Sequence, residues 1–419
     1  MKKVIALVAT MDTKGRECAY AASRVELLGC TVCFIDVGIM GVSGVEAHVT
    51  REQVAHAANV EINALRNGGD RGTAITAMSH GVSAIVADLF KFNRIDGLLG
   101  LGGSSGSSIV AAAMQVLPIG FPKVMVSTMA SGNTKPYVGT RDVTLMHSVV
   151  DISGLNRISR KILTNAAAAI CGMAAVEHFK DVDRPAVALT MMGVTTPCAT
   201  IASEALERGG LEVLTFHANG AGGPAMEALI TDDVFAAVLD MTPAEWADEL
   251  LGGKSSAGPN RMEAAARHGL PQVVSVGGLD MVRFAGRSTI PVHFRARHFH
   301  DHNPTITLMR TSEDESRQLG IIIGAKLNMA TGPVRVLLPM RGISSLDCAG
   351  GEFEDQNARY ALFGALQNQL NPAIACEEMD LHINDPEFGN ALAGALVGLM
   401  ASETKPPNDL YSVTQGTQL

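Results

Sequence analysis

Short apolar segments alternate with segments of helical periodicity along this chain, and this alternation most constrains its fold. Val4–Ala9 is a continuous apolar run, as expected for a parallel strand that is covered on both faces. Ala186–Met191 opens the second half of the chain in the same way, and each run is followed by a Thr-rich loop, a helix and a second strand. Strands that alternate with helices predict parallel sheets with right-handed crossovers. We therefore expect an α/β protein of two Rossmann-like domains, each a mainly parallel sheet covered by helices.

The length and one charged segment predict where the chain divides. The chain has 419 residues, which is more than one ordinary hydrophobic core holds. The segment Lys180–Pro185 is charged and ends in proline, as linkers between domains commonly are. We expect a first Rossmann-like domain over residues 1–180, and a second Rossmann-like α/β domain with a polar cleft over residues 186–419.

Charge and cysteine content exclude several classes of protein. The net charge of -9 argues against general nucleic-acid binding. No apolar run reaches the roughly 18–20 residues that a membrane helix needs, so we expect no membrane association. The seven cysteines are an odd number and scattered, which is typical of reduced thiols in a cytoplasmic protein.

A glycine- and serine-rich loop follows the buried strand that ends near Leu101. Its glycines let the backbone approach a ligand closely, and its serines and free N–H groups suit a phosphate. One residue too many separates Gly102 from Gly106 for the dinucleotide pattern G-x-G-x-x-G, and no Walker Gly-Lys-Ser/Thr follows. The sequence leaves two interpretations open, a phosphate site and a tightly packed turn from strand to helix.

Three loops of the first half follow strands and should converge at one edge of the sheet, where such sheets bind ligands. Lys14 is the natural phosphate cation of this set, and Asp12 or Glu17 could hold Mg²⁺. The alternative for Asp12 is an N-cap of the first helix. The predicted cofactor-binding residues are Thr10, Asp12, Thr13, Lys14, Gly102, Gly103, Ser104, Ser105, Gly106, Ser107, Thr128, Ala130, Ser131 and Gly132.

The second half concentrates histidine and arginine at predicted strand ends. His217 precedes a second glycine loop, Gly220–Gly223, and is either a general acid or base or a capping histidine. Glu227, in the helix that follows, could point at the same cleft. His302 and Arg310 could face a substrate, with Arg310 as a bidentate clamp for a carboxylate or phosphate. The alternative for Arg310 is an ion pair with Asp314 or Glu315. We expect His217, Glu227, His302 and Arg310 to be catalytic.

Three histidines near residue 300 raise the question of a metal. If Arg297–Asn303 is extended, then His298, His300 and His302 share one face. Such a face can bind a transition metal, and a hydrogen-bonded structural cluster is the alternative. We assign no metal site here.

Several of these segments resemble the family of the tomato mosaic virus resistance protein. The resemblance implies two domains, of which the amino-terminal one binds ATP. It covers nearly the whole chain and rests on residues 10–17, 102–106, 127–132, 150–156, 217–227, 302–311 and 382–386.

From the residues and the resemblance together we expect a cytoplasmic, ATP-binding enzyme that acts on a small anionic metabolite in a cleft between its domains. The reaction would be phosphoryl transfer or another ATP-assisted step. The alternative is a nucleotide-sensing interaction protein without turnover. A homo-oligomer is expected because large cytosolic α/β proteins commonly form symmetric ones.

Overall fold

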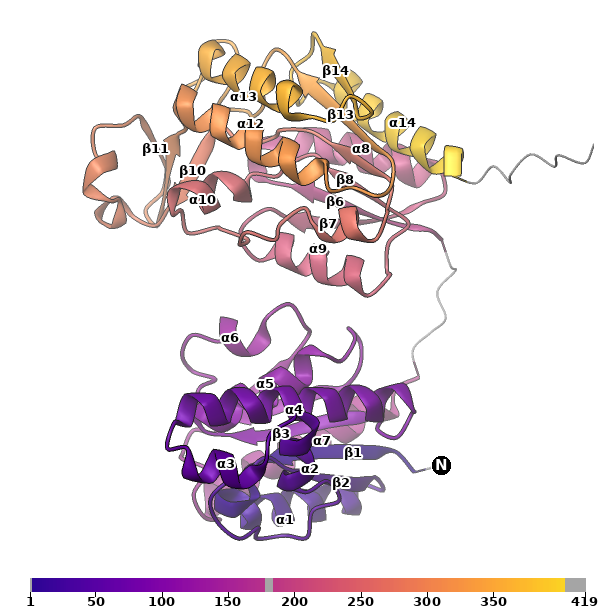
Figure 1. The fold of residues 1–419 in the computed structure, drawn as a ribbon, viewed down its shortest axis with the longest axis vertical. Helices are drawn as coiled ribbons and strands as arrows, with labels where there is room; N and C mark the ends of the chain where they lie inside the picture. The colour runs from indigo at the N-terminus through magenta and orange to yellow at the C-terminus, as the bar shows by residue number, and fades with distance from the viewer. Residues whose placement is uncertain (1, 178–183, 404–419) are drawn as a thin grey trace, which may run out of the picture. The chain divides into compact units, whose positions relative to one another are not determined.

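Parallel sheets organise both halves of the chain, as the alternation of strands and helices predicts. The computed structural model describes residues 2–177 and 184–403. The chain divides into two units, Met1–Lys180 (unit 1) and Asp181–Leu419 (unit 2), each with helices packed on a mainly parallel sheet (Figure 1). The expected fold class is confirmed. Residues 180–183 of the predicted linker lie outside the described residues.

Unit 1 contains a five-stranded sheet in which every neighbouring pair is parallel, in the order β2-β1-β3-β4-β5. The chain leaves β1 toward β2 on one side and continues with β3 on the other, so the sheet has a topological switch point between β1 and β3. The strands are β1 (Val4–Ala9), β2 (Thr31–Asp36), β3 (Gly97–Gly102), β4 (Lys123–Ser127) and β5 (Thr144–His147).

Helices cover both faces of this sheet. Met78 and Val110, from α4 and α5, belong to the apolar core on one face, and Ala21 and Ile170, from α1 and α7, belong to the core on the other. Two helices, rather than one, lie between residues 51 and 67, because Asn59 between them has a left-handed backbone, with φ of 57°. The helices are α1 (Met11–Leu27), α2 (Arg51–Ala57), α3 (Ile62–Asn67), α4 (Arg71–Lys91), α5 (Ser104–Gln115), α6 (Lys135–Val138) and α7 (Arg157–Ala175).

Unit 2 contains a six-stranded parallel sheet in the order β14-β13-β9-β8-β6-β7, and a small antiparallel sheet in the order β10-β12-β11. β10 and β12 are too short to show a clear period in the sequence and were not expected from it. The strands are β6 (Ala186–Met191), β7 (Glu212–His217), β8 (Ala237–Asp240), β9 (Gln272–Val274), β10 (Met281–Phe284), β11 (Phe299–Asn303), β12 (Ile306–Arg310), β13 (Val334–Pro339) and β14 (Ala375–Met379).

The helices of unit 2 pack mainly on the parallel sheet. The sequence analysis missed α10, which follows the Thr-Pro turn after β8. The α-helices are α8 (Thr196–Arg208), α9 (Gly222–Thr231), α10 (Glu245–Leu251), α11 (Ala264–Arg267), α12 (Glu313–Leu327), α13 (Gln356–Gln369) and α14 (Pro386–Glu403), and the short 3₁₀ turns are η1 (Gly193–Thr195), η2 (Arg287–Thr289) and η3 (Val292–Phe294).

The cysteines of the chain and the apolar helix α4 need a closer description. Cys30 and Cys33 have C-x-x-C spacing, but Cys30 belongs to the core on one face of the sheet and Cys33 packs against the core on the other. All seven cysteines are free thiols. By length and composition alone, α4 is apolar enough to cross a membrane, yet its Met78 and Val82 lie in the core of unit 1, as in a core helix.

Candidate functional site

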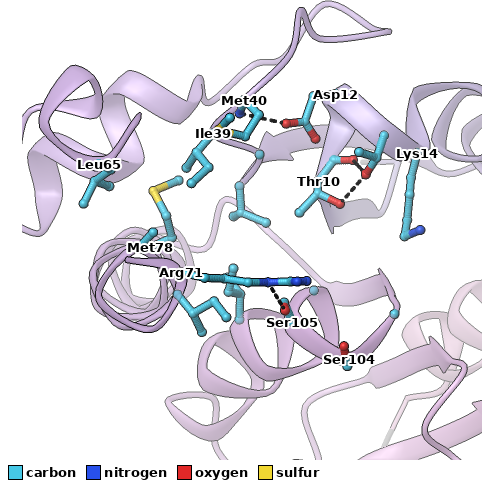
Figure 2. A pocket seen from close by; sticks show the side chains of 18 of the residues that line it. Thr10, Asp12, Lys14, Ile39, Met40, Leu65, Arg71, Met78, Ser104 and Ser105 are labelled. Carbon is cyan, nitrogen blue, oxygen red and sulfur yellow. Dashed lines mark hydrogen bonds between the residues drawn. The ribbon is translucent and has the colours of Figure 1, made fainter. Parts of the chain in front are cut away.

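A pocket of about 780 Å³ opens in unit 1 (Figure 2). Its walls are the loops that follow β1, β2 and β3, the segment from α3 to α4, and the turn after β4. The loops after β1 and β3 flank the topological switch point, which is where open parallel sheets bind ligands. Of the predicted cofactor-binding residues, those that line this pocket are Thr10, Asp12, Thr13, Lys14, Gly103, Ser104, Ser105, Gly106 and Thr128.

The amino-terminal end of α5 forms one polar wall of the pocket. Gly103 is the N-cap residue and supplies no side-chain cap, so the N–H groups of the first turn have no acceptor within the helix. A Cβ atom at Gly103 would approach only Thr128 Oγ1, at 4.0 Å, which shows that the backbone here faces open space. An uncapped helix start facing a pocket suits an anion.

Lys14 lies on the other side of the switch point. Its φ of -124° and ψ of 17° interrupt the helical backbone of α1 after the first turn. Its Nζ donates to the Ile152 carbonyl at 2.8 Å, which leaves two of its three N–H groups for other acceptors. Thr10 and Thr13, linked by a hydroxyl hydrogen bond of 2.9 Å, add polar groups to the same wall.

Arg71 reaches into the pocket from the start of α4, and the sequence analysis did not identify it. Its Nε donates to Ser105 Oγ at 3.1 Å, and Figure 2 shows the guanidinium lying across the start of α5. Asp70 before an apolar helix is a recognisable N-cap signal. That signal locates the start of α4, but only the packing of α4 on α5 shows that Arg71 enters the pocket.

The far end of the pocket is apolar. Ile39, Leu65 and Met78 gather there, away from Lys14 and Ser104 (Figure 2). The loop that carries Ile39 is held by Asp12, whose Oδ2 accepts from the N–H groups of Met40 at 3.0 Å and the next residue at 3.3 Å. Thr10 occupies the N-cap position of α1, so the alternative role of Asp12 as an N-cap is wrong.

Five predicted residues do not line the pocket. A Cβ atom at Gly102 would lie 2.4 Å from the Ser107 nitrogen, and Ser107 Oγ is buried 2.6 Å from Ser127 Oγ. These two residues therefore serve the packed turn, which is the alternative interpretation of the loop. The remaining three, in the turn after β4, are Ala130, Ser131 and Gly132.

The acidic residue at the end of β2 argues against a dinucleotide site. In dinucleotide-binding folds an acid near this position bonds the ribose. Here Asp36 is buried, accepts from the N–H groups of Met11 and Gly38, and pairs with Arg51, whose Nε lies 2.9 Å from its Oδ2. Asp36 is fully engaged within the protein.

The equivalent switch point of unit 2, between β6 and β8, is closed by the protein itself. Thr195 and Thr242, from the loops that follow these strands, are both buried and share a hydroxyl hydrogen bond of 2.9 Å. The second glycine loop is also occupied from within. The carboxylate of Glu245, completely buried, accepts from the N–H groups of Gly220 at 2.7 Å and Gly223 at 3.2 Å.

Two of the four predicted catalytic residues are tied into the fold of unit 2. Glu227 accepts from the N–H groups of Met262 and Ala264 at 2.7 and 2.8 Å, and pairs with a buried arginine. Arg310 is buried, and its Nε donates to the Phe353 carbonyl at 2.8 Å. Neither side chain is available as an acid or as a ligand clamp.

The alternative expectation, that Arg310 pairs with an acid, is confirmed, but the acid is neither Asp314 nor Glu315. Asp347 is the carboxylate nearest to it, with 3.7 Å between Nη2 and Oδ1. Asp314 pairs with Arg317 instead. Glu315 pairs with Arg297 at 2.7 Å.

The predicted histidines remain accessible. His217 ends β7, and desolvation, followed by the charge of Arg283, lowers its pKa, so the imidazole is neutral near pH 7. His302 is exposed on β11, where the pairing register shifts. His298 and His300 both approach Glu352, His300 at 2.5 Å. Among the described residues no three His, Cys, Asp or Glu side chains are grouped to hold a metal.

Asp280 is a buried acid whose titration should be visible in the stability of unit 2. Its Oδ2 accepts from Ser344 Oγ at 2.7 Å, and its Oδ1 has no partner among the described residues. Burial, helped by the charge of Asp347, raises the pKa of Asp280 from 3.8 to about 7. The folded protein therefore holds this proton more tightly than the unfolded chain, so this group makes stability fall as pH rises from about 4 to about 7.

We expect Asp280→Asn, which removes the charge and keeps the shape, to raise the melting temperature at pH 8 by several degrees and to leave it nearly unchanged at pH 4. The single tryptophan of the chain, Trp246, lies in unit 2 and its fluorescence reports the unfolding of that unit. Asp314→Asn, at an 84% exposed side chain, is the control. Equal pH dependence in wild type and Asp280→Asn would show that Asp280 does not titrate in this interval.

Comparison with known proteins gives matches over both units. The model of the N-terminal domain of the uncharacterised protein family UPF0261 matches residues 3–179, and that of its C-terminal domain matches residues 184–400. A UPF0261 protein of Clostridium tetani is 45% identical over 403 residues, 96% of this chain and 100% of the relative. The tomato (Solanum lycopersicum) ToMV resistance protein Tm-1 is 42% identical over 335 residues, 78% of this chain and 44% of that protein.

Among solved structures, MurG of Acinetobacter baumannii aligns over 97% of this chain and 96% of its own, with 13% identity and a TM-score of 0.23. A UDP-N-acetylglucosamine 2-epimerase from Rickettsia bellii aligns over 65% of this chain and 78% of its own, with 8% identity and the same TM-score. Scores this low do not establish a shared function.

Proposed function

The chain belongs to the uncharacterised protein family UPF0261, which includes the tomato protein, and on that premise we propose that unit 1 binds ATP in the pocket at the ends of β1 and β3. The observation that carries the proposal is the polarity of this pocket. One end is apolar, at Leu65 and Met78, and the other combines the uncapped start of α5 with Lys14 and Arg71. A nucleotide is divided in the same way, because its flat base is the less polar end and its phosphate chain is the charged end.

The proposed placement follows from this division. The base lies against Ile39, Leu65 and Met78, where its burial removes apolar surface from water. The phosphates lie at Gly103–Gly106, where backbone N–H groups and serine hydroxyls donate to them. The volume of about 780 Å³ is within the range of small-molecule pockets.

Mg²⁺ that accompanies ATP needs a carboxylate near the phosphates. Asp12 is held by the loop after β2, and Glu17 is buried and accepts from the Gly154 N–H group. Asp151 lines the pocket, is exposed, and has no hydrogen bond or ion pair among the described residues. We therefore assign Mg²⁺ to Asp151, where the ion would neutralise phosphate charge.

We further propose that the protein is a cytoplasmic, homo-oligomeric enzyme that uses ATP on a small anionic metabolite, as expected from the sequence. The accessible His217 supports this proposal, because an imidazole that is neutral near pH 7 can exchange protons with a substrate, and His302 is exposed as well. The cleft between the domains stays a prediction. The second candidate, a nucleotide-sensing protein without turnover, is favoured by the internal contacts of Glu227 and Arg310, which leave unit 2 fewer catalytic groups.

Calorimetric titration of the full-length protein tests the nucleotide site. We expect ATP with Mg²⁺ to bind with one site per chain, adenosine to bind more weakly because it lacks phosphates, and NADH not to compete because Asp36 is engaged. ATP that produces no heat of binding and no thermal stabilisation would contradict the proposal. Release of ADP or AMP in the presence of anionic metabolites would distinguish the enzyme from the sensor.

A further inference from the structure

The start of α4 places a cation where the electrostatics of the protein oppose it. Arg71 is the first residue of α4, directly after the N-cap Asp70. The amino-terminal end of a helix carries partial positive charge and disfavours cations. The guanidinium of Arg71 also lies across the start of α5, whose N–H groups are uncapped (Figure 2). Two positive helix ends therefore surround one positive side chain.

The acid next to Arg71 does not offset this charge through an ion pair. The Asp70 carboxylate accepts from the N–H groups of Gly72 at 3.0 Å and Thr73 at 2.9 Å, and these bonds, with that of the Thr73 hydroxyl, lower its pKa. Asp70 is used to cap α4. Within residues 2–177 and 184–403, Arg71 forms no ion pair, and Nε to Ser105 Oγ is its one hydrogen bond.

Neighbouring arginines show the contrast. Arg66 also lines the pocket, but its Nε donates to the Ile39 carbonyl at 2.6 Å and it pairs with Glu52 at 3.6 Å. Arg51, behind the pocket wall, pairs with Asp36. These two arginines hold the loop after β2 in place. Arg71 has no comparable structural task, and four of its five N–H donors have no acceptor among the residues that the structure describes.

We propose that Arg71 selects nucleoside di- and triphosphates by binding the phosphates beyond the first, which rests on the proposed nucleotide site. The free donors come from three elements, namely the first turn of α5, Lys14 and Arg71. These elements lie on different sides of the pocket, and a chain of phosphates offers them more negative charge and more acceptor oxygens than one phosphate group does. A polyphosphate reaches them together and removes the repulsion at Arg71, and the flat guanidinium fits two phosphate oxygens at once.

The test compares Arg71→Ala, Arg71→Lys and wild type by calorimetry with ATP, ADP, AMP, adenosine and inorganic tripolyphosphate. We expect Arg71→Ala to weaken ATP, ADP and tripolyphosphate by about 10- to 100-fold, and to leave adenosine unchanged. Arg71→Lys keeps the positive charge but loses the two-pronged guanidinium, so its affinity for ATP should lie between those of wild type and Arg71→Ala. Arg16→Ala, at an exposed residue of α1 outside the pocket, is the matched control and should change nothing.

The outcomes separate this inference from the proposed function. If wild type binds tripolyphosphate and not ATP, the nucleotide assignment fails, and a loss in Arg71→Ala still supports the anion role of Arg71. Equal affinities of wild type and Arg71→Ala for ATP would overturn the inference and leave the nucleotide site intact. If Arg71→Ala lost the same factor of affinity for ATP and for adenosine, Arg71 would only maintain the shape of the pocket, and the inference would also be overturned. If wild type binds neither ATP nor tripolyphosphate, both proposals fail.

Discussion

Gly103→Val is expected to abolish ATP binding and to leave the protein folded. The φ of -81° at Gly103 is open to any residue, and a Cβ atom there meets only Thr128 Oγ1 at 4.0 Å. The valine methyl groups therefore extend into the pocket, between the start of α5 and the turn after β4. They would occupy the space in which a phosphate approaches the backbone. Calorimetry should show a loss of at least about 100-fold in affinity, which corresponds to about 2.7 kcal/mol.

Two other glycines provide comparison variants for this prediction. Gly172, in α7, has nothing within 4 Å of a Cβ atom, so Gly172→Val is a matched control that should bind ATP normally. Gly102→Ala should instead destabilise unit 1, since its Cβ atom would lie 2.4 Å from the Ser107 nitrogen. If folded Gly103→Val bound ATP with wild-type affinity, the proposed placement of the phosphates at this loop would be wrong. A lowered melting temperature in Gly103→Val would assign the glycine to packing.

Arg261→Met is expected to destabilise unit 2 by about 3–5 kcal/mol. The Arg261 side chain is 1% exposed and lies among three carboxylates, with Nη1 2.7 Å from Asp240, Nη1 3.2 Å from Glu227 and Nε 3.0 Å from Glu245. Burial by itself lowers the pKa of Arg261, but the charges and hydrogen bonds of these acids outweigh burial and raise it. Methionine fills a similar space and leaves the three acids without their counter-charge.

Urea unfolding followed by Trp246 fluorescence measures this loss in unit 2. Arg267→Met is the matched control, because Arg267 is 63% exposed and its partner Glu263 keeps a second ion pair with Lys326 when Arg267 is removed. Adding Glu245→Gln to Arg261→Met should restore part of the stability, since Gln keeps an oxygen for the Gly220 N–H group and removes one buried charge. A change within about 1 kcal/mol for Arg261→Met would contradict the proposed role of this network.

The two units use similar glycine-rich loops in different ways. Each unit has a glycine-rich turn between a strand and a helix, and the backbone N–H groups of such a turn suit an anion. In unit 2 the anion is Glu245, which belongs to the protein and is neutralised by Arg261. In unit 1 the N–H groups at Gly103–Gly106 face the pocket. This contrast is the reason to look for the ligand of the protein in unit 1.

The sequence by itself determined the fold class, most of the strands, and the part of the pocket wall that lies on the loops after β1 and β3. These features depend on local periods and on the rule that parallel strands end at one edge of a sheet. That rule predicts from the sequence that Thr10–Lys14 and Gly103–Gly106 lie close together, and both segments line the pocket. Only the tertiary structure decided which polar groups are already satisfied. Arg310 and Glu227 have the residue types of catalytic groups, yet partners 35 to 43 positions away engage them. Arg71 shows the reverse, because an ordinary helix start becomes part of the pocket only when α4 packs on α5. Hydrogen-bond satisfaction depends on distant partners in the folded chain, and no local pattern of residues records it.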